Sequence, residues 1–443
     1  MISATGYRRD IDGLRSLAIL PVLAFHARLP GVSGGFVGVD IFFVISGFLI
    51  TGIIAREMDR GEFSIVRFYE RRARRILPAL FAMIAFVLAV ASWLYLPGDF
   101  AKVPPSALMA LAFLSNVWFF LQTGYFQGGS ETMPLLHCWS LGVVEQFYIG
   151  FPILLWLIAR FAPDWRRAIV AAVAAFSFAM AWLTQANGDG FAFYLLPPRA
   201  WELFVGALLA LGTVPQVTRA ALREALALAG LALIAGSVIL YDRHTVFPGV
   251  TAIPPVLGSA LLIHTAPGTL AGRLLSWPLT VGIGLISYSL YLWHWPLIVF
   301  AEYAAGGRLA GWHQAAAITA AFVMAYASWR WIERPFRDGK RFDRKRIFVL
   351  SGTGMAALGL LAAAMLGLGG WESRFPPQVV QFVRAEEDFS PLRDVCTDGA
   401  TGPALAKCLI GPQQPPTALV WGDSHSIECA GALGQEVALA ECQ

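Results

Sequence analysis

The sequence predicts an all-α polytopic membrane protein with about eleven transmembrane helices. Hydrophobic residues make up 57% of its 443 residues and charged residues only 14%, and the mean hydropathy is +0.61. Soluble domains carry about 25% charged residues. The composition therefore excludes an ordinary soluble protein and indicates a chain that is largely embedded in lipid.

Long apolar runs and the distribution of basic residues predict the number of spans. Twelve full crossings would leave both termini on one side, but the basic N-terminus and the basic loop from Arg334 to Arg346 are both expected inside, and only the last run follows that loop. We therefore expect the run 105–122, which contains Ser115 and Asn116, not to cross. The inside segments then hold 22 Lys and Arg residues, against 4 in the outside loops before the tail. The twelve runs are residues 14–30, 37–55, 77–96, 105–122, 139–161, 168–186, 198–213, 224–241, 249–265, 279–302, 313–332 and 347–368.

The first apolar run carries two ionisable side chains, Arg15 and His26. They are eleven positions apart, so on a helix they lie within about 20° of one face and about 16 Å apart along the axis. An ionisable group at bilayer depth costs about 2.5 kcal/mol or more unless it faces a bundle interior or water. This placement favours a functional pair. The alternative is a snorkelling anchor at Arg15 and a polar cap at His26.

An arginine-rich segment precedes the third run. Arg71, Arg74 and Arg75 have helical i, i+3, i+4 spacing and share a face, and Arg72 lies beside them. Guanidinium forks suit bidentate capture of phosphate. The alternative is that these residues serve only to orient the chain in the membrane.

Four further ionisable groups occur inside later runs. Glu145 is expected to face the bundle interior, because a carboxylate facing lipid would be costly. Arg199 and Glu202 have the spacing of an ion pair within the bundle. His294 lies between two tryptophans, and an interfacial aromatic belt explains it as well as chemistry does.

Taken together, these motifs resemble the acyltransferase-3 family of membrane acyltransferases. The resemblance implies that Arg15 and His26 belong to the catalytic signature and that Arg71, Arg72, Arg74 and Arg75 hold the phosphates of acetyl-CoA, a cytoplasmic acyl donor. One departure is that the usual adjacent acidic pair reads Val144-Glu145 here. The stretches that carry the resemblance are 34–51, Arg71-Arg-Ala-Arg-Arg-Ile-Leu-Pro78, 136–148, Arg199-Ala-Trp-Glu-Leu203, 286–296 and Trp331-Ile-Glu-Arg-Pro-Phe336.

The composition changes after the last run. Four cysteines (Cys396, Cys408, Cys429 and Cys442) are confined to this tail, which suits an oxidising periplasm, and four cysteines allow three connectivities. Residues 418–426 read as a short strand that ends in Gly-Asp-Ser, a geometry used for nucleophiles. They resemble the first block of the SGNH hydrolase family, with Ser424 as the nucleophile. The late Asp-x-x-His block of that family is missing, so we expect the start of a truncated α/β SGNH-like domain.

The predicted domains follow from these motifs. They are a membrane domain with ten spans (1–337), a basic loop with a linking eleventh span (338–370), a periplasmic extension (371–417) and the SGNH-like start (418–443). The N-terminus is expected in the cytoplasm and the C-terminus in the periplasm of a bacterial inner-membrane protein.

The sequence thus predicts a membrane O-acyltransferase that moves an acyl group, expected to be acetyl, from acyl-CoA to a hydroxyl of a surface polysaccharide. Lipopolysaccharide O-antigen is the favoured acceptor, and peptidoglycan or an exopolysaccharide is the alternative. His26 is expected to act as base or transient acyl carrier, Arg15 and Glu145 to assist, and Ser424 to perform a second transfer. No metal is expected. A rival interpretation is an exporter of an acyl or glycan intermediate.

Overall fold

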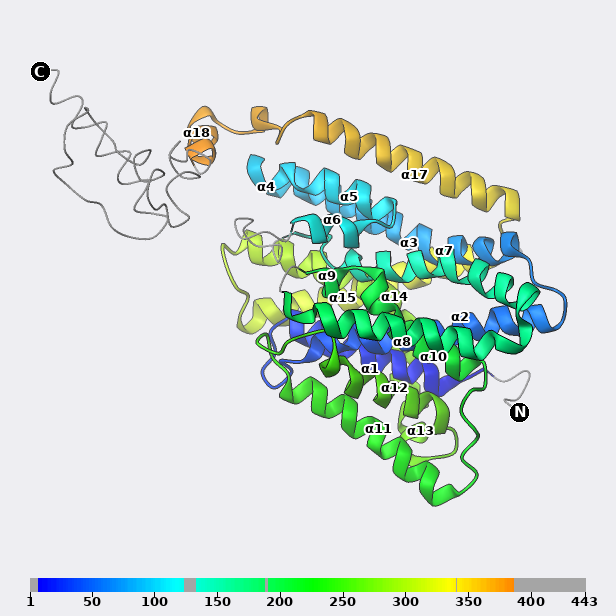
Figure 1. Ribbon diagram of the computed structural model, residues 1–443. Coiled ribbons are helices and arrows are strands. Elements are labelled where there is room, and N and C mark those ends of the chain that lie inside the picture. Colours follow the sequence, from blue (N-terminus) through cyan, green and yellow to red (C-terminus); the bar gives the residue numbers. More distant parts are fainter. Residues whose placement is uncertain (1–6, 123–132, 188–189, 340, 386–443) are drawn as a thin grey trace, which may run out of the picture. The chain divides into compact units, whose positions relative to one another are not determined.

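Helices build the whole described part of the chain. The computed structural model describes residues 7–122, 133–187, 190–339 and 341–385, and Figure 1 shows these helices in chain order. Within those ranges every regular element is helical, which confirms the all-α prediction for them. The described residues divide into two units, one within 7–95 and 99–370 and the other within 96–98 and 371–385. The expected SGNH-like start and the tail cysteines lie outside the described residues.

Eleven of the twelve apolar runs each coincide with most of one α-helix of 13 to 30 residues in the described part. Seven helical stretches are long and apolar enough to cross a membrane, namely those of α2, α3, α7, α8, α11, α14 and α17. The other four, α1, α10, α12 and α15, are shorter or less apolar. The bounds are α1 Arg9–His26, α2 Gly38–Asp59, α3 Ile65–Leu94, α7 Cys138–Phe161, α8 Arg166–Thr184, α10 Leu196–Ala210, α11 Ala220–Leu240, α12 Ile253–Thr265, α14 Pro278–Ala304, α15 Gly311–Ser328 and α17 Arg344–Gly367.

The remaining run, 105–122, is broken into α5 (Val103–Leu111) and α6 (Ser115–Gln122). Helices of 9 and 8 residues reach about 13 and 12 Å, well short of the roughly 30 Å of a hydrocarbon core. Asn116 joins α6 to α7 through a reciprocal amide pair with Gln146, with N–O distances of 3.2 and 2.7 Å. The break agrees with the expectation that this run does not cross.

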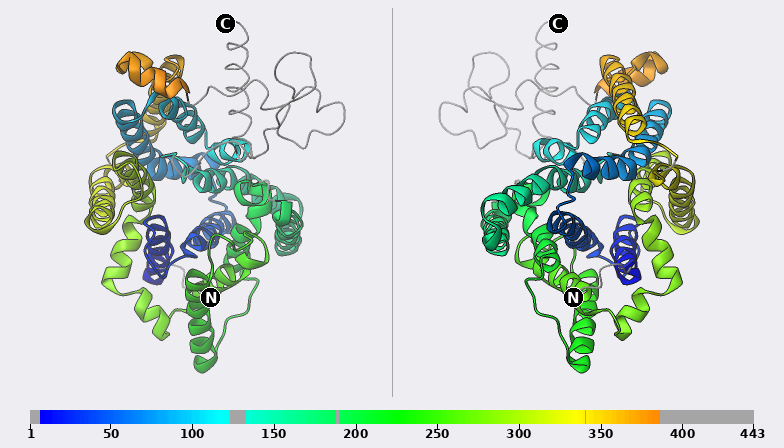
Figure 2. Two further views of the ribbon diagram at one scale, coloured as in Figure 1. Left: turned by 90° about the vertical axis from the view of Figure 1, so that its left-hand side faces the viewer. Right: turned by 90° about the vertical axis from the view of Figure 1, so that its right-hand side faces the viewer.

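Helices α1 and α2 lie in the interior of the first unit, and Figure 2 shows them in blue, surrounded by later helices. Helix α2 packs closely on α10 through two glycines. A Cβ at Gly47 would lie 1.8 Å from the carbonyl oxygen of Leu203, and one at Gly206 would lie 2.0 Å from that of Val44. Small residues at such crossings let two backbones approach. Asp40 of α2 also lies 3.2 Å from Arg199 of α10, so the residue numbers of the contacts rise together and the two helices run in the same direction.

Helix α14 packs on α1 in the same close manner. A Cβ at Gly284 would lie 1.8 Å from the carbonyl oxygen of Asp12, and further along both helices His294 contacts His26. Because the residue numbers of the contacts rise together, α14 also runs parallel to α1. Residues of α14 therefore lie beside α1 along its length from Arg15 to His26.

Helix α3 extends the arginine segment into a regular helix. Its first turn is capped by Ser64, whose hydroxyl accepts from the backbone N–H of Arg67 at 3.4 Å. Thirty residues span about 45 Å, which exceeds a hydrocarbon core of about 30 Å. The first turns of α3, with their arginines, can therefore lie beyond the apolar region.

Short helices complete the described chain. A π-helical turn, η6 (Trp329–Glu333), follows α15, and α18 belongs to the second unit, where Arg384 pairs with Glu372 at 2.6 Å. The other short elements are η1 Gly35–Val37, α4 Pro97–Ala101, η3 Pro163–Trp165, η4 Gln185–Asn187, α9 Phe191–Tyr194, η5 Val250–Ala252, α13 Leu270–Leu275, α16 Arg334–Arg337, η7 Glu372–Arg374 and α18 Pro377–Ala385.

Candidate active site

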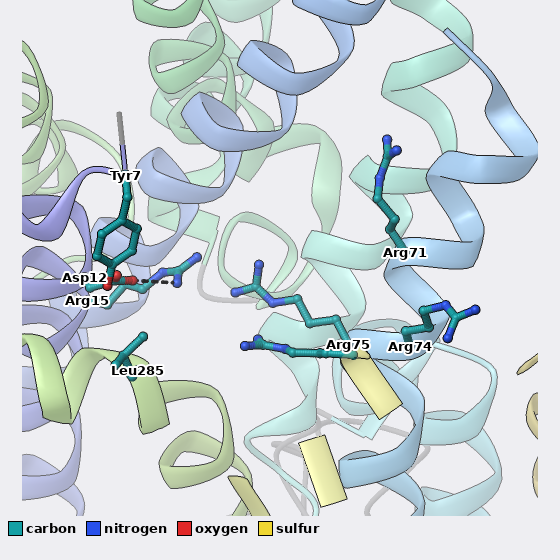
Figure 3. Close-up of a pocket in the computed structure, with 8 residues that line it drawn as sticks. Tyr7, Asp12, Arg15, Arg71, Arg74, Arg75 and Leu285 are labelled. Atoms are coloured by element: carbon teal, nitrogen blue, oxygen red, sulfur yellow. Dashed lines mark hydrogen bonds and ion pairs between the residues drawn. The ribbon is translucent and has the colours of Figure 1, made fainter. Parts of the chain in front are cut away.

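A cavity of about 370 Å³ opens where α1, α3, α14 and α16 meet, and Figure 3 shows its lining. Five of the lining side chains are arginines and one is a carboxylate. Such an excess of positive charge suits an anionic ligand. The lining residues are Tyr7, Asp12, Arg15, Arg71, Arg74, Arg75, Leu285 and Arg337.

The arginines of the cavity differ in how far the protein already engages them. Arg15 pairs with Asp12 at 3.1 Å, Arg71 with Glu57 at 2.9 Å, and Arg337 with Glu333 at 3.4 Å. Within the described residues Arg75 makes no ion pair or hydrogen bond, and its side chain points across the cavity toward Arg15 (Figure 3). Arg75 is therefore the arginine with the most capacity for a ligand.

Arg74 is engaged by the protein itself. Its Nε and one terminal nitrogen donate to Glu70 at 3.1 and 2.8 Å, and the backbone carbonyl of Phe342 accepts at 2.8 Å. The other terminal nitrogen lies 3.5 Å from the carbonyl oxygen of Phe336. In Figure 3 the guanidinium points away from Arg15 and Arg75. Arg74 therefore joins α3 to the segment that follows α16.

The two remaining polar candidates near α3 lie beside the cavity. Arg72 stacks over the rings of Phe68 and Tyr148, 5.9 and 5.3 Å from their centroids. Glu145 is buried in α7, as expected, and interacts electrostatically with Arg72 and Arg75. These two arginines thus give the buried carboxylate opposite charges within reach.

The expected ion pair of α10 is confirmed and has a third member. Arg199 lies 3.1 Å from Glu202 and 3.2 Å from Asp40 of α2, and all three side chains are at most 1% exposed. Asp40 and Arg199 each precede the glycine of the α2–α10 crossing by seven residues, which is two helical turns. This triad lies away from the cavity and holds two helices together.

His26, at the C-terminal end of α1, belongs to a cluster of histidines and not to the cavity. Its Nδ1 lies 2.9 Å from Nε2 of His294, and the His294 ring lies 5.8 Å from that of His137. Trp295 packs on His26 with a centroid distance of 4.6 Å. Arg15 and His26 therefore share one helix but serve different surroundings, about 16 Å apart along its axis.

Sequence reasoning passed over several residues of these two sites. Asp12, Arg337 and Glu333 shape the cavity, and Glu333 also accepts from Ser289. The stretches that resemble the family include Glu333, the partner of Arg337, and His294. This resemblance is the sequence signal that could have identified both residues. Ser424 lies outside the described residues, so its proposed role has no geometry here.

Comparison with known proteins identifies the family. Residues 8–332 match the model of the acyltransferase-3 family, described as "Acyltransferase domain". The chain is 36% identical over 363 residues to "Putative membrane-bound transacylase BcsY" of Komagataeibacter xylinus, covering 82% of this chain and 89% of that protein. No solved structure matches the chain.

Two further relatives are longer than the matched region. "Peptidoglycan O-acetyltransferase OatA" of Listeria monocytogenes is 28% identical over 77% of this chain, and "Putative O-acetyltransferase SAS0844" of Staphylococcus aureus is 32% identical over 75%. The match spans 59% and 57% of those two proteins, somewhat more than half of each. The chain belongs to the acyltransferase-3 family and is a membrane-bound acyltransferase.

Proposed function

We propose that the protein transfers an acetyl group from acetyl-CoA to a hydroxyl of a cell-surface polysaccharide. The observation that carries this proposal is the arginine cavity at one end of α1, with His26 at the other end of the same helix. The cavity would bind the charged part of the donor, and the histidine would serve the reaction.

The donor side rests on charge and size. A phosphate ester accepts charge-assisted hydrogen bonds from guanidinium forks, and Arg15, Arg75 and Arg337 all line the cavity. Its volume lies at the lower end of the roughly 300–1,000 Å³ typical of small-molecule sites. The cavity would therefore hold the phosphates, and the long pantetheine arm would extend along α1 toward His26.

The chemical side rests on His26. A hydroxyl is a weak nucleophile until a base removes its proton. In the proposed reaction His26 takes that proton while the hydroxyl oxygen attacks the thioester carbonyl. The carbon–sulfur bond breaks, and the thiolate of CoA leaves with a proton returned by His26. The alternative role, a transient acyl carrier, uses the same ring.

The acceptor and the orientation are part of the proposal. Lipopolysaccharide O-antigen is the favoured acceptor, and the name of the Listeria relative supports peptidoglycan as the alternative. In an inner-membrane protein with a cytoplasmic N-terminus, the cavity lies on the side of the donor. A reporter fused after Arg346 would then be cytoplasmic and one fused after Gly370 periplasmic. The opposite pattern would place the cavity on the periplasmic side of the membrane, away from the donor.

Radiolabel transfer tests the proposal. The purified protein in lipid nanodiscs is supplied with acetyl-CoA labelled in the acetyl group and, in separate reactions, with O-antigen polysaccharide, peptidoglycan fragments or an exopolysaccharide. Label on one of these acceptors supports the proposal and identifies the acceptor. Uptake of a labelled intermediate into vesicles without any transfer would instead support the exporter.

A further inference from the structure

The ring of His294 meets the ring of His26 edge to edge. The two ring planes are inclined by only 16°, the centroids are 5.1 Å apart, and Nδ1 of His26 lies 2.9 Å from Nε2 of His294. Ring N–H groups and nitrogen lone pairs lie in the plane of an imidazole. Nearly parallel planes with a short N–N distance therefore describe a hydrogen bond between the rings.

The other nitrogen of His294 decides which ring donates. Nδ1 of His294 lies 3.0 Å from the backbone carbonyl oxygen of Leu290. A carbonyl oxygen only accepts, so Nδ1 of His294 carries a hydrogen. Nε2 of a neutral His294 then has a free lone pair. It follows that Nδ1 of His26 is the donor and that Nε2 of His26 keeps its lone pair.

The surroundings of His294 favour the neutral ring on which this assignment depends. The residue is 0% exposed, and the rings of His26, His137 and Tyr291 lie around it. No carboxylate among the described residues pairs with it. A second proton would bury a positive charge without a counterion, which is costly in an apolar interior.

The sequence around His294 explains how this end of α14 is held. Pro296 has no backbone N–H, so the carbonyl of Leu292 lacks its helical donor at this point of α14. The hydroxyl of Tyr291 donates to the backbone carbonyl of His137 at 2.8 Å. The start of α7 is thus fixed against α14 around His294.

We propose that His294 is a positioning residue that holds His26 in the tautomer protonated on Nδ1. This inference rests on the proposed function. Nε2 of His26 is then the atom that takes the proton from the acceptor hydroxyl and returns it to the thiolate of CoA. During the transfer, Nδ1–H of the charged His26 ring keeps donating to His294, which stabilises the positive charge.

Two substitutions at position 294 distinguish the hydrogen bond that His294 accepts from His26 from the one that it donates to Leu290. His294→Gln places an amide oxygen near the position of Nε2 and keeps an acceptor for His26. His294→Asn keeps a donor for Leu290 but cannot reach His26. We expect Asn to lower kcat about 10²-fold or more, with KM for acetyl-CoA within about twofold of wild type, and Gln to restore most of kcat. Wild-type kcat in Asn, or equal losses in a stable Gln variant, would overturn the proposal.

The tautomer itself is measurable without turnover. Solid-state NMR of the wild-type protein with ¹⁵N-labelled histidine, in nanodiscs, distinguishes protonated from bare ring nitrogens. The signals of His26 are assigned by their absence in His26→Gln. We expect His26 to be protonated on Nδ1, and protonation on Nε2 would overturn the proposal. If wild type transfers no label from acetyl-CoA, the proposed function fails, while this spectrum still decides the role of His294.

Discussion

The two ends of α1 use ionisable side chains in opposite ways. Near Arg15 the helix faces an open cavity lined by five arginines, one of which, Arg75, makes no ion pair or hydrogen bond within the described residues. Near His26 the helix faces His294. Both ring nitrogens of His294 have hydrogen-bond partners, namely His26 and the backbone carbonyl of Leu290. In the function that we propose, the first end attracts an anion and the second orients a neutral ring.

This difference indicates how one helix can serve binding and chemistry separately. A guanidinium attracts phosphate over a distance and tolerates an exposed site, because its charge is permanent. A general base needs a defined tautomer and a fixed direction, which burial and hydrogen bonds provide. Changes at the two ends should therefore affect different kinetic constants.

The largest effect is expected at the histidine end. His26→Gln should lower kcat about 10²- to 10⁴-fold, the usual contribution of a positioned base, with affinity for coenzyme A unchanged. Single-turnover transfer and equilibrium binding on the same preparation measure the two quantities. Arg15→Ala should instead weaken binding. If His26→Gln lost affinity and kept kcat, the division between the two ends would be wrong.

The next effect concerns stability. Arg199→Leu leaves Asp40 and Glu202 buried without their cation, and removing one partner of a buried ion pair costs about 3–5 kcal/mol. Thermal unfolding in detergent should show a marked fall in Tm. The control is Arg28→Leu, which removes a half-exposed pair with Glu302 at 2.9 Å and should cost about 1 kcal/mol or less. Equal shifts would mean that the triad is not a structural clamp.

The smallest effect separates two adjacent arginines. Arg75→Lys should raise KM for acetyl-CoA about tenfold, because an ammonium cannot make the second hydrogen bond of a guanidinium fork. Arg74→Lys is the matched control and should lower Tm with little change in KM, since Arg74 already bonds to Glu70 and Phe342. A KM that rises in Arg74→Lys but not in Arg75→Lys would mean that Arg74, and not Arg75, binds the donor.

Much of the fold follows from sequence because long apolar runs must become helices in lipid. The ion pair of Arg199 and Glu202 followed from a spacing of three residues. Asp40 did not, because it is 159 positions from Arg199 and meets it only through the packing of α2 on α10. The sequence left the role of His294 open, because tryptophans flanking a histidine look the same in an aromatic belt and in a bundle interior.

The arginine segment shows the same limit. Helical spacing placed Arg74 and Arg75 on one side of α3, but which of them is available for a ligand depends on acceptors elsewhere. The carbonyls that engage Arg74 belong to residues more than 260 positions away. Local pattern therefore predicted the cluster, and only tertiary structure distinguished its members.

The central claim is that the donor lies along α1, with its phosphates at Arg15, Arg75 and Arg337 and its thioester at His26. A cryo-electron microscopy structure of the inactive His26→Gln variant with acetyl-CoA bound tests it most directly. We expect density for the phosphates in the arginine cavity and the acetyl group beside residue 26. Phosphate density outside the cavity, or an acetyl group remote from residue 26, would contradict the claim.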